Sequence, residues 1–231
     1  SDQTLVDQNV AARWNQAFVE GTDKNYPNLD LVRLELWHFE HKPGHLLEYA
    51  FGSGVNTIHL ANCGHQVKAV DVSNAAAKLV QGKLDSHTEL RDQVDLHVLD
   101  WNAQKLPFPD NYFDYVVAVS IMSLLGTPKR INLALAELNR TLKMGGKIIT
   151  DVNSTQSQFA VDGVLVDKNV YENRGRKGTD NPVRCFCPDN PDTFAKILQK
   201  HFHVDDIGYS AHQYYNNQIH EYIYCATKRS D

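Results

Sequence analysis

Residues 46–54, Leu46-Leu47-Glu48-Tyr49-Ala50-Phe51-Gly52-Ser53-Gly54, decide the fold of this chain. An apolar strand runs into a glycine-rich turn, and a helical pattern begins directly afterwards near Val55. The first N–H groups of a helix have no partner within it, and the helix dipole favours a negative charge in front of them. Glycines let a ligand approach the backbone closely. The stretch predicts a strand–turn–helix unit that binds an anionic group, with a simple tight connection as the alternative.

The second predicted strand, 66–71, ends in Asp71. A carboxylate at the tip of this strand is placed to accept hydrogen bonds from two ribose hydroxyls. The structural alternative is that Asp71 caps the next helix, in competition with Ser73 and Asn74.

The third predicted strand, 94–99, is followed by Asp100 and Trp101. Asp100 could accept a hydrogen bond from an adenine amino group, with Trp101 flanking the ring. The alternative is a structural aspartate followed by a core tryptophan.

Strands and helices alternate through the middle of the chain, which predicts βαβ units around a parallel sheet. Two amphipathic helices precede this region, and a helix and a two-stranded antiparallel hairpin end the chain. The irregular segment 153–191 is long enough to be a substrate lid. The predicted helices are 4–20, 28–40, 54–63, 74–84, 128–143 and 192–201, and the predicted strands are 45–50, 66–71, 94–99, 113–119, 147–152, 203–214 and 219–227.

Composition indicates one ordinary globular domain. The chain has 231 residues, 42% of them hydrophobic and 22% charged, and a net charge of −5. An acidic chain has no bulk attraction for phosphate backbones, so nucleic-acid binding is disfavoured. The first residues show no secretory signal, and the longest apolar run, 115–125, is far shorter than a membrane span. With only four cysteines, we expect free thiols and a cytoplasmic location.

A metal site is not expected. Cys185 and Cys187 form a C-x-C pair, and His201 and His203 form an H-x-H pair. Zinc sites usually use wider ligand spacing, so we interpret these as thiols in an ordinary loop and histidines at a strand edge. The three histidines that precede the first strand are interpreted as surface residues: His38, His41 and His45.

Five separated motifs, taken together in order, resemble the class I S-adenosylmethionine-dependent methyltransferases over residues 44–152. They are Glu48-x-Ala50-x-Gly52-x-Gly54, Ala69-Val70-Asp71-Val72-Ser73, Leu99-Asp100, Leu106-Pro107-Phe108 through Phe113-Asp114-Tyr115-Val116-Val117, and Leu142-Lys143-Met144-Gly145-Gly146-Lys147. The resemblance implies an α/β, Rossmann-like, seven-stranded and mostly parallel sheet with a C-terminal antiparallel hairpin strand. Helices would cover both faces, and an N-terminal helical cap would be added.

The same resemblance implies S-adenosylmethionine as the cofactor. The loop 50–54 would hold its methionyl part, Asp71 its ribose and Asp100 its adenine, while Ser120 and Ile121 would flank the sulfonium and the acceptor. The implied cofactor-binding residues are Glu48, Ala50, Gly52, Gly54, Asp71, Val72, Asp100, Trp101 and Ser120.

One residue departs from the family pattern, because Ala50 stands where the family usually has glycine. Alanine costs little at negative φ, whereas positive φ would strain it. The competing cofactor is NAD, whose fingerprint requires a third glycine where this chain has Thr57.

The acceptor must be inferred from the segments outside the core. Tyr26, Arg33, Ile121 and Arg184 are the candidate substrate residues. Arg184 belongs to a basic cluster within 168–184 that also contains Lys168, Arg174, Arg176 and Lys177 and could recruit an anionic substrate, a solvated loop being the alternative. In the terminal hairpin His212 is the candidate general base, while Tyr222 and Tyr224 share one face and are expected to pack against a helix.

The sequence thus predicts a single methyltransferase domain, 1–231, that transfers a methyl group to an O or N nucleophile of a small molecule by in-line displacement. Alternatives are a protein or RNA methyltransferase and a non-catalytic S-adenosylmethionine-binding protein. Within the domain, 1–43 would be the cap, 44–152 the cofactor core, 153–191 the lid, and 192–231 the terminal helix and hairpin. Oligomeric state is not set by the sequence, and no nucleic-acid or membrane partner is expected.

Overall fold

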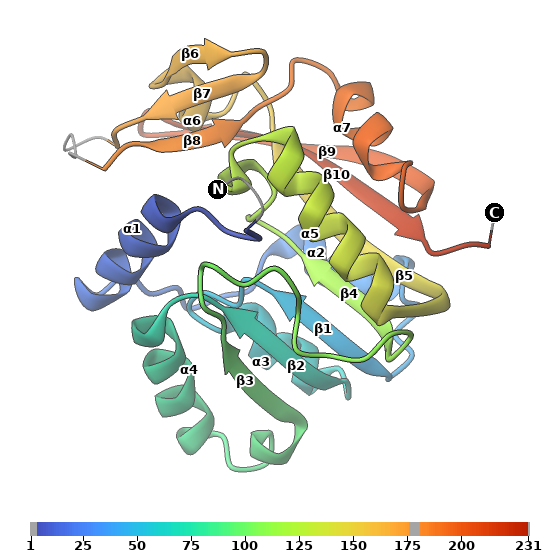
Figure 1. Cartoon of the computed structure of the whole chain (residues 1–231). Helices are drawn as coiled ribbons and strands as arrows, with labels where there is room; N and C mark the ends of the chain where they lie inside the picture. The colour runs from blue at the N-terminus through green and yellow to red at the C-terminus, as the bar shows by residue number, and fades with distance from the viewer. Residues whose placement is uncertain (1–3, 176–180, 231) are drawn as a thin grey trace.

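A seven-stranded sheet forms the centre of the computed structural model, which describes residues 4–175 and 181–230 (Figure 1). The strand order is β3-β2-β1-β4-β5-β10-β9, and β10 runs antiparallel to both β5 and β9. This arrangement confirms the predicted Rossmann-like sheet with a terminal antiparallel strand. The bounds are β1 His45–Tyr49, β2 Gln66–Asp71, β3 Val94–Val98, β4 Phe113–Ala118, β5 Leu142–Asn153, β9 His203–Tyr214 and β10 Asn217–Thr227.

The strand order reverses next to β1, which pairs in parallel with β2 on one side and with β4 on the other. Connections from β1 and from β4 leave this point in opposite directions. Open α/β sheets bind ligands in the crevice at the carboxyl ends of strands where the order reverses. The topology therefore predicts the site near the ends of β1, β2 and β4.

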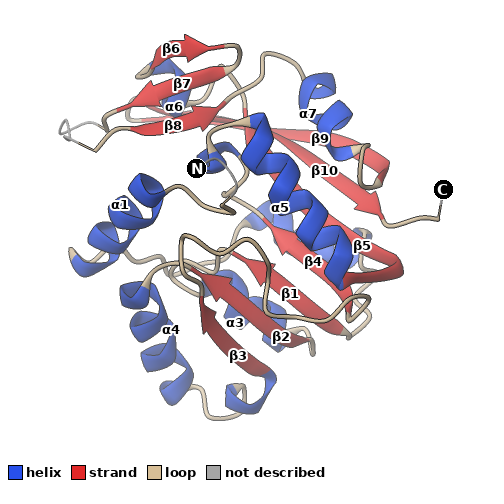
Figure 2. Ribbon diagram, in the orientation of Figure 1, coloured by secondary structure: helices blue, strands red, loops and turns tan. Residues whose placement is uncertain are grey.

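Helices cover both faces of the sheet, as Figure 2 shows. Residues of α2 (Leu29–Trp37), α3 (Val55–Asn62) and α4 (Asn74–Ser86) share one hydrophobic core. Residues of α1 (Gln8–Val19), α5 (Pro128–Thr141) and α7 (Pro191–Leu198) belong to a second core. Tyr224 packs against Phe194 of α7 with ring centroids 4.9 Å apart, so the predicted packing of the hairpin is confirmed.

Side-chain caps fix where the helices begin. Ser73 Oγ accepts the Ala76 N–H, so Ser73, and not Asp71 or Asn74, is the N-cap of α4. Thr127 caps α5, and a proline follows it at the first helical position.

The segment 153–191 is more regular than the sequence indicates. It forms the short helix α6 (Gln158–Val161) and a three-stranded antiparallel sheet of β6 (Val164–Asp167), β7 (Val170–Asn173) and β8 (Val183–Phe186). The placement of Cys185 in a loop is wrong, because it lies in β8, whereas Cys187 follows the strand as a loop residue. Both are buried in the second core. Of the predicted basic cluster, Arg176 and Lys177 lie outside the described residues.

Two other details differ from the prediction. β5 begins at Leu142 rather than 147, because the backbone around Gly145 pairs with Lys228 across the sheet. His38 is buried rather than exposed, and its Nε2 lies 3.1 Å from the carbonyl oxygen of Ala226. Within residues 4–175 and 181–230, no helix combines the length and apolarity needed to cross a membrane.

Candidate functional site

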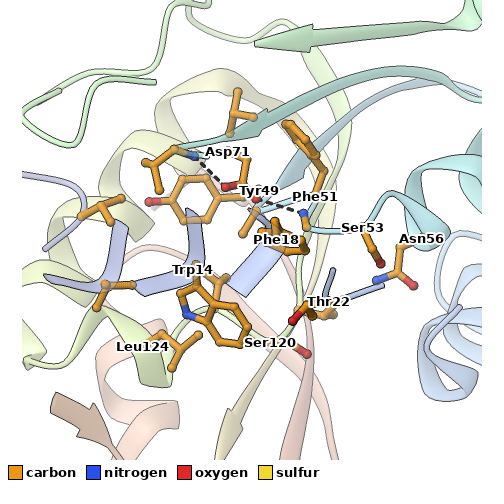
Figure 3. Close-up of a pocket in the computed structure, with 18 of the residues that line it drawn as sticks. Trp14, Phe18, Thr22, Tyr49, Phe51, Ser53, Asn56, Asp71, Ser120 and Leu124 are labelled. Atoms are coloured by element: carbon orange, nitrogen blue, oxygen red, sulfur yellow. Dashed lines mark hydrogen bonds between the residues drawn. The ribbon is translucent and has the colours of Figure 1, made fainter. Parts of the chain in front are cut away.

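A cavity of about 180 Å³ lies at the carboxyl ends of β1, β2 and β4, where the strand order reverses (Figure 3). Helix α1 and the residues after it form the opposite wall, whereas α2 packs with α3 and α4 and contributes no lining residue. The lining residues are mostly apolar: Val6, Val10, Trp14, Phe18, Thr22, Lys24, Tyr49, Ala50, Phe51, Gly52, Ser53, Val55, Asn56, Val70, Asp71, Val72, Leu99, Val119, Ser120, Ile121 and Leu124.

Helix α1 is fixed over the cavity by polar contacts at both sides. Asn15 Oδ1 accepts hydrogen bonds from Ser73 Oγ at 2.9 Å and from Ala75 N at 3.1 Å. Arg13 donates to the carbonyl oxygen of Asn173 in β7 at 3.2 Å. The cap therefore joins the cofactor half of the domain to the small sheet.

The glycine-rich turn opens the amino end of α3 to the cavity. Gly54 is the N-cap, has φ +79°, and supplies no side-chain cap. A Cβ at this position would lie 2.6 Å from Val80 Cγ2, so only glycine fits. Val55 and Asn56, the first residues of α3, line the cavity. Their position leaves the helix terminus available for an anionic group, as predicted.

Asp71 forms the cavity wall and also holds the turn. Its Oδ2 accepts the Gly52 N–H at 2.9 Å, and its Oδ1 accepts the N–H groups of Val72 at 2.7 Å and Ser73 at 3.1 Å. Burial raises the pKa of Asp71, while these three donors oppose the rise. A carboxylate has about four acceptor positions, so one remains for a ligand hydroxyl.

Ala50 lines the cavity in the left-handed region, with φ +73°. Of the two cases described for an alanine in place of the family's glycine, the structure shows the strained one, with positive φ. Left-handed backbone costs a non-glycine residue about 1–2 kcal/mol. Ser120, also predicted at the site, has φ +59°, and its N–H donates to Asp151 Oδ1 at 2.8 Å.

Two buried donors in the wall need partners. Within the described part of the chain, no group accepts a hydrogen bond from Trp14 Nε1 or Tyr49 Oη, although both atoms are buried. Both residues line the cavity through their rings, which Figure 3 labels, whereas the two donor atoms themselves are shielded from it. A buried unsatisfied donor costs about 1–3 kcal/mol, so these two atoms lower the stability of the cavity wall. Sequence reasoning missed both, because helical spacing marked Trp14 only as a core residue.

Glu48 was predicted at the cofactor but does not line the cavity. Side chains alternate along a strand, and since Tyr49 faces the cavity, Glu48 lies behind it at 2% exposure. Thr57 Oγ1 donates a hydrogen bond to Glu48 Oε1. Burial raises the pKa of Glu48 to about 8, so its carboxyl group is protonated at neutral pH.

Asp100 and Trp101 are likewise outside the cavity lining, to which this segment contributes Leu99 instead. Asp100 is exposed, and its Oδ1 accepts the Asn102 N–H at 2.8 Å. Trp101 packs on the second core. Both therefore follow the structural alternative in this conformation.

Of the four predicted substrate residues, only Ile121 lines the cavity. Tyr26 is 71% exposed. Arg33 pairs with Asp30 at 3.5 Å, and Arg184 lies on β8 with its Nε 4.0 Å from Glu172. The two arginines are exposed because each sits on the outer surface of its element.

His212 is an exposed residue of β9, and β5 and β10 separate that strand from β4. It does not reach the cavity. Sequence reasoning missed instead buried Asp151, which bonds to the Ser120 N–H, and half-buried Glu221. Asp151 of β5 and Glu221 of β10 share one face of the sheet, and burial raises the pKa of both. The charge of Glu221 adds to the rise at Asp151.

Fold and site define a Rossmann-like domain that binds a nucleotide-type ligand at the reversal of its strand order. Residues 47–150 match a family model described as a methyltransferase domain. Residues 47–150 are therefore similar to methyltransferase domains, and the chain has the Rossmann-like fold of S-adenosylmethionine-dependent methyltransferases of known structure.

Named relatives agree with this family. The chain is 29% identical over 116 residues to the demethylmenaquinone methyltransferase of Bacillus licheniformis, a match that covers 49% of this chain and 46% of that protein. The similarity thus spans about half the length of the curated relative.

Solved structures show the same fold. One described as a SAM-dependent methyltransferase from Methanosarcina mazei superposes with a TM-score of 0.72 at 17% identity, covering 91% of this chain and all of that one. The 1,6-didemethyltoxoflavin-N1-methyltransferase of Burkholderia thailandensis, solved with its substrate and S-adenosylhomocysteine, has a TM-score of 0.67 at 18% identity, covering 96% of this chain and 88% of that one.

Proposed function

We propose that the protein transfers the methyl group of S-adenosylmethionine to a small-molecule acceptor. The observation that carries this proposal is the cavity, which brings together Asp71, the glycine turn at α3, and the aromatic rings of Trp14 and Tyr49. In such a lining, Asp71 can accept hydrogen bonds from ligand hydroxyls, the amino end of α3 can bind a ligand carboxylate, and the remaining walls are apolar.

The residues present fit this cofactor. The free acceptor position of Asp71 suits a ribose hydroxyl, and the open amino end of α3 suits the methionyl carboxylate. Val72 and Leu99 provide an apolar wall for the adenine ring. When bound, S-adenosylmethionine supplies a methyl group already activated by its sulfonium.

The chain's contribution to the reaction is mainly alignment. Holding an acceptor in line with the reacting bond can supply about 7–11 kcal/mol of barrier reduction in favourable systems. Ser120, Ile121 and Leu124 form the wall where β4 ends, and we assign them to the acceptor side. Asp151 lies behind this wall and accepts the Ser120 N–H, so we assign it to position Ser120.

A largely apolar cavity favours a neutral, ring-containing acceptor over an anionic one. Lys24 is the one basic side chain among the described residues that line it. The relative named for demethylmenaquinone and the structural neighbour named for didemethyltoxoflavin are consistent with a small ring compound.

Calorimetry with S-adenosylmethionine and S-adenosylhomocysteine tests the cofactor, and incubation of labelled cofactor with phenols, quinols and amines tests the reaction. We expect micromolar binding and label transfer to one of these classes. Binding of the cofactor without transfer to any acceptor in cell extract would favour a non-catalytic S-adenosylmethionine-binding protein. Transfer only to material that a small-pore filter retains would favour a protein or RNA substrate.

A further inference from the structure

A second polar cluster lies at the amino ends of β1 and β2, the sheet edge opposite the cofactor cavity. Its members come from the end of α2, the following turn, α3 and the residue before β2. They are Glu35, His41, His59, Cys63 and His65. The proposed methyl transfer uses none of them.

Glu35 is fixed at the centre of this cluster. It is 2% exposed, and His65 beside it is fully buried. The Gly44 N–H donates to His65 Nδ1 at 3.2 Å, so His65 carries its proton on Nε2. That Nε2–H donates to Glu35 Oε1 at 3.1 Å. One carboxylate oxygen is therefore held, and the other, Oε2, faces His41.

The turn after α2 places His41 against Glu35 by means of a strained backbone conformation. Glu40 and His41 are consecutive non-glycine residues in the left-handed region, with φ +57° and +52°. Such conformations are strained for residues other than glycine and gather where function requires a fixed geometry. The result places His41 Nδ1 2.7 Å from Glu35 Oε2.

Helix α3 presents a matching pair from the other side. His59 and Cys63 are four residues apart, so they share one face of the helix end. His59 Nε2 lies 3.7 Å from Cys63 Sγ, and one ligand atom each from Glu35, His41 and Cys63 lie within 4.8 Å of one another. Tetrahedral zinc with bonds of about 2.0–2.3 Å separates its ligand atoms by about 3.3–3.8 Å.

We propose that Glu35, His41 and Cys63 hold a zinc ion, with His59 moving from its contact with Cys63 to complete the ligand set and His65 orienting Glu35 from behind. The mixed carboxylate, imidazole and thiolate donors suit Zn²⁺ better than Mg²⁺ or Ca²⁺, which prefer oxygen ligands. Closure requires Glu35 Oε2 and His41 Nδ1, now 2.7 Å apart, to separate, and the widest spacing among the three ligand atoms to shorten by about 1 Å. Exposed His41 has room for this movement. The role is structural, because the ion would join α2, the turn 38–44 and α3.

Protons balance on binding. Burial raises the pKa of the Cys63 thiol to about 11, so without an ion it holds its proton, which binding would release to solvent. Burial also lowers the pKa of His59, which leaves its imidazole neutral and able to ligate.

Cobalt(II) added to metal-free full-length protein tests the site, because a thiolate ligand gives a charge-transfer band. We expect one equivalent of Co²⁺ to produce this band and Zn²⁺ to displace it. Cys63→Ser should remove the band, and His41→Ala should weaken Zn²⁺ binding at least tenfold, about the lower bound for losing even a supporting residue. The control His45→Ala removes a neighbouring exposed histidine and should change neither result.

The proposal fails if Co²⁺ gives no thiolate band, if the band survives in Cys63→Ser, or if His41→Ala binds Zn²⁺ as tightly as the wild type. Since His41 is exposed, its replacement leaves a folded protein even if Cys63→Ser does not. S-adenosylhomocysteine affinity is measured in parallel. Its loss would count against the proposed function, whereas the metal results are independent of it.

Discussion

The carboxylate of Asp71 and the amide of Gly52 are joined by a 2.9 Å hydrogen bond, so the end of β2 holds the turn that follows β1. Asp71 therefore has two roles, and neither is the helix cap that the sequence offered as an alternative, because Ser73 caps α4. It faces the cavity, and it fixes the backbone of the glycine turn that lines the cavity beside it.

Asp71→Asn tests both roles. An amide loses the negative charge and places N–H groups against the backbone donors of Gly52 or Val72. Because hydrogen bonds to charged groups contribute about 1.5–3 kcal/mol, we expect S-adenosylhomocysteine affinity to fall about 10- to 100-fold, and the free energy of unfolding to fall as well. Calorimetry and urea denaturation measure the two effects.

Asp100→Asn is the matched control, because Asp100 is exposed and outside the cavity lining. Its affinity should stay close to that of the wild type. An equal loss in both variants would restore the adenine-binding role that the resemblance implied for Asp100.

Ala50→Gly should stabilise the protein. Relieving the left-handed alanine recovers about 1 kcal/mol, which corresponds to a rise in Tm of about 2–4 °C for a chain of this size. Ala136→Gly, at an exposed site within α5, should instead cost about 1 kcal/mol. If thermal denaturation shows that both substitutions destabilise, the strain at Ala50 is not real.

Tyr49→Phe should raise stability and leave affinity unchanged. The substitution removes a buried hydroxyl that no described group satisfies, so stability should rise by about 1 kcal/mol. Because this hydroxyl is shielded from the cavity, the affinity for S-adenosylhomocysteine should stay close to that of the wild type. Thermal shifts with and without the ligand measure both effects, and a loss of affinity would show that the ligand reaches this hydroxyl.

Glu48→Gln should flatten the pH dependence of stability. Burial raises the pKa of Glu48 to about 8, so between its ordinary value and pH 8 the folded state binds more protons than the unfolded state. The free energy of unfolding must then fall as pH rises through this window, by up to about 1.4 kcal/mol per unit. Glutamine keeps an acceptor for Thr57 but cannot ionise. Parallel wild-type and variant curves from urea denaturation at pH 5–8 would refute this interpretation.

The sheet could be predicted well because its signals are local. β1, β2, β3 and β4 lie within one residue of their predicted bounds, since each is a short apolar run between turn residues. The three-stranded sheet of β6, β7 and β8 was not predicted, because its strands are short and are defined by pairing with one another rather than by a pattern of apolar residues. The start of β5 depends on a contact with Lys228, far away in sequence.

The site was predictable only where a motif fixes the backbone. Gly54 and Asp71 follow from the turn and the strand tip, and Ile121 follows from the end of β4. Tyr49 and Trp14 could not be assigned, because their roles depend on how α1 docks. Glu48 was assigned by motif position, but strand alternation turns it away from the cavity.

The cap has a consequence for evolution and for truncation. The matched family region, 47–150, contains the glycine turn and Asp71 but not Trp14 or Phe18. Six of the 21 lining residues thus come from a segment that can diverge independently of the sheet. Relatives with the same sheet could exchange this segment and thereby methylate different acceptors. A protein shortened to begin at residue 44 would keep the sheet and the glycine turn, but its bound ligand would be open to solvent.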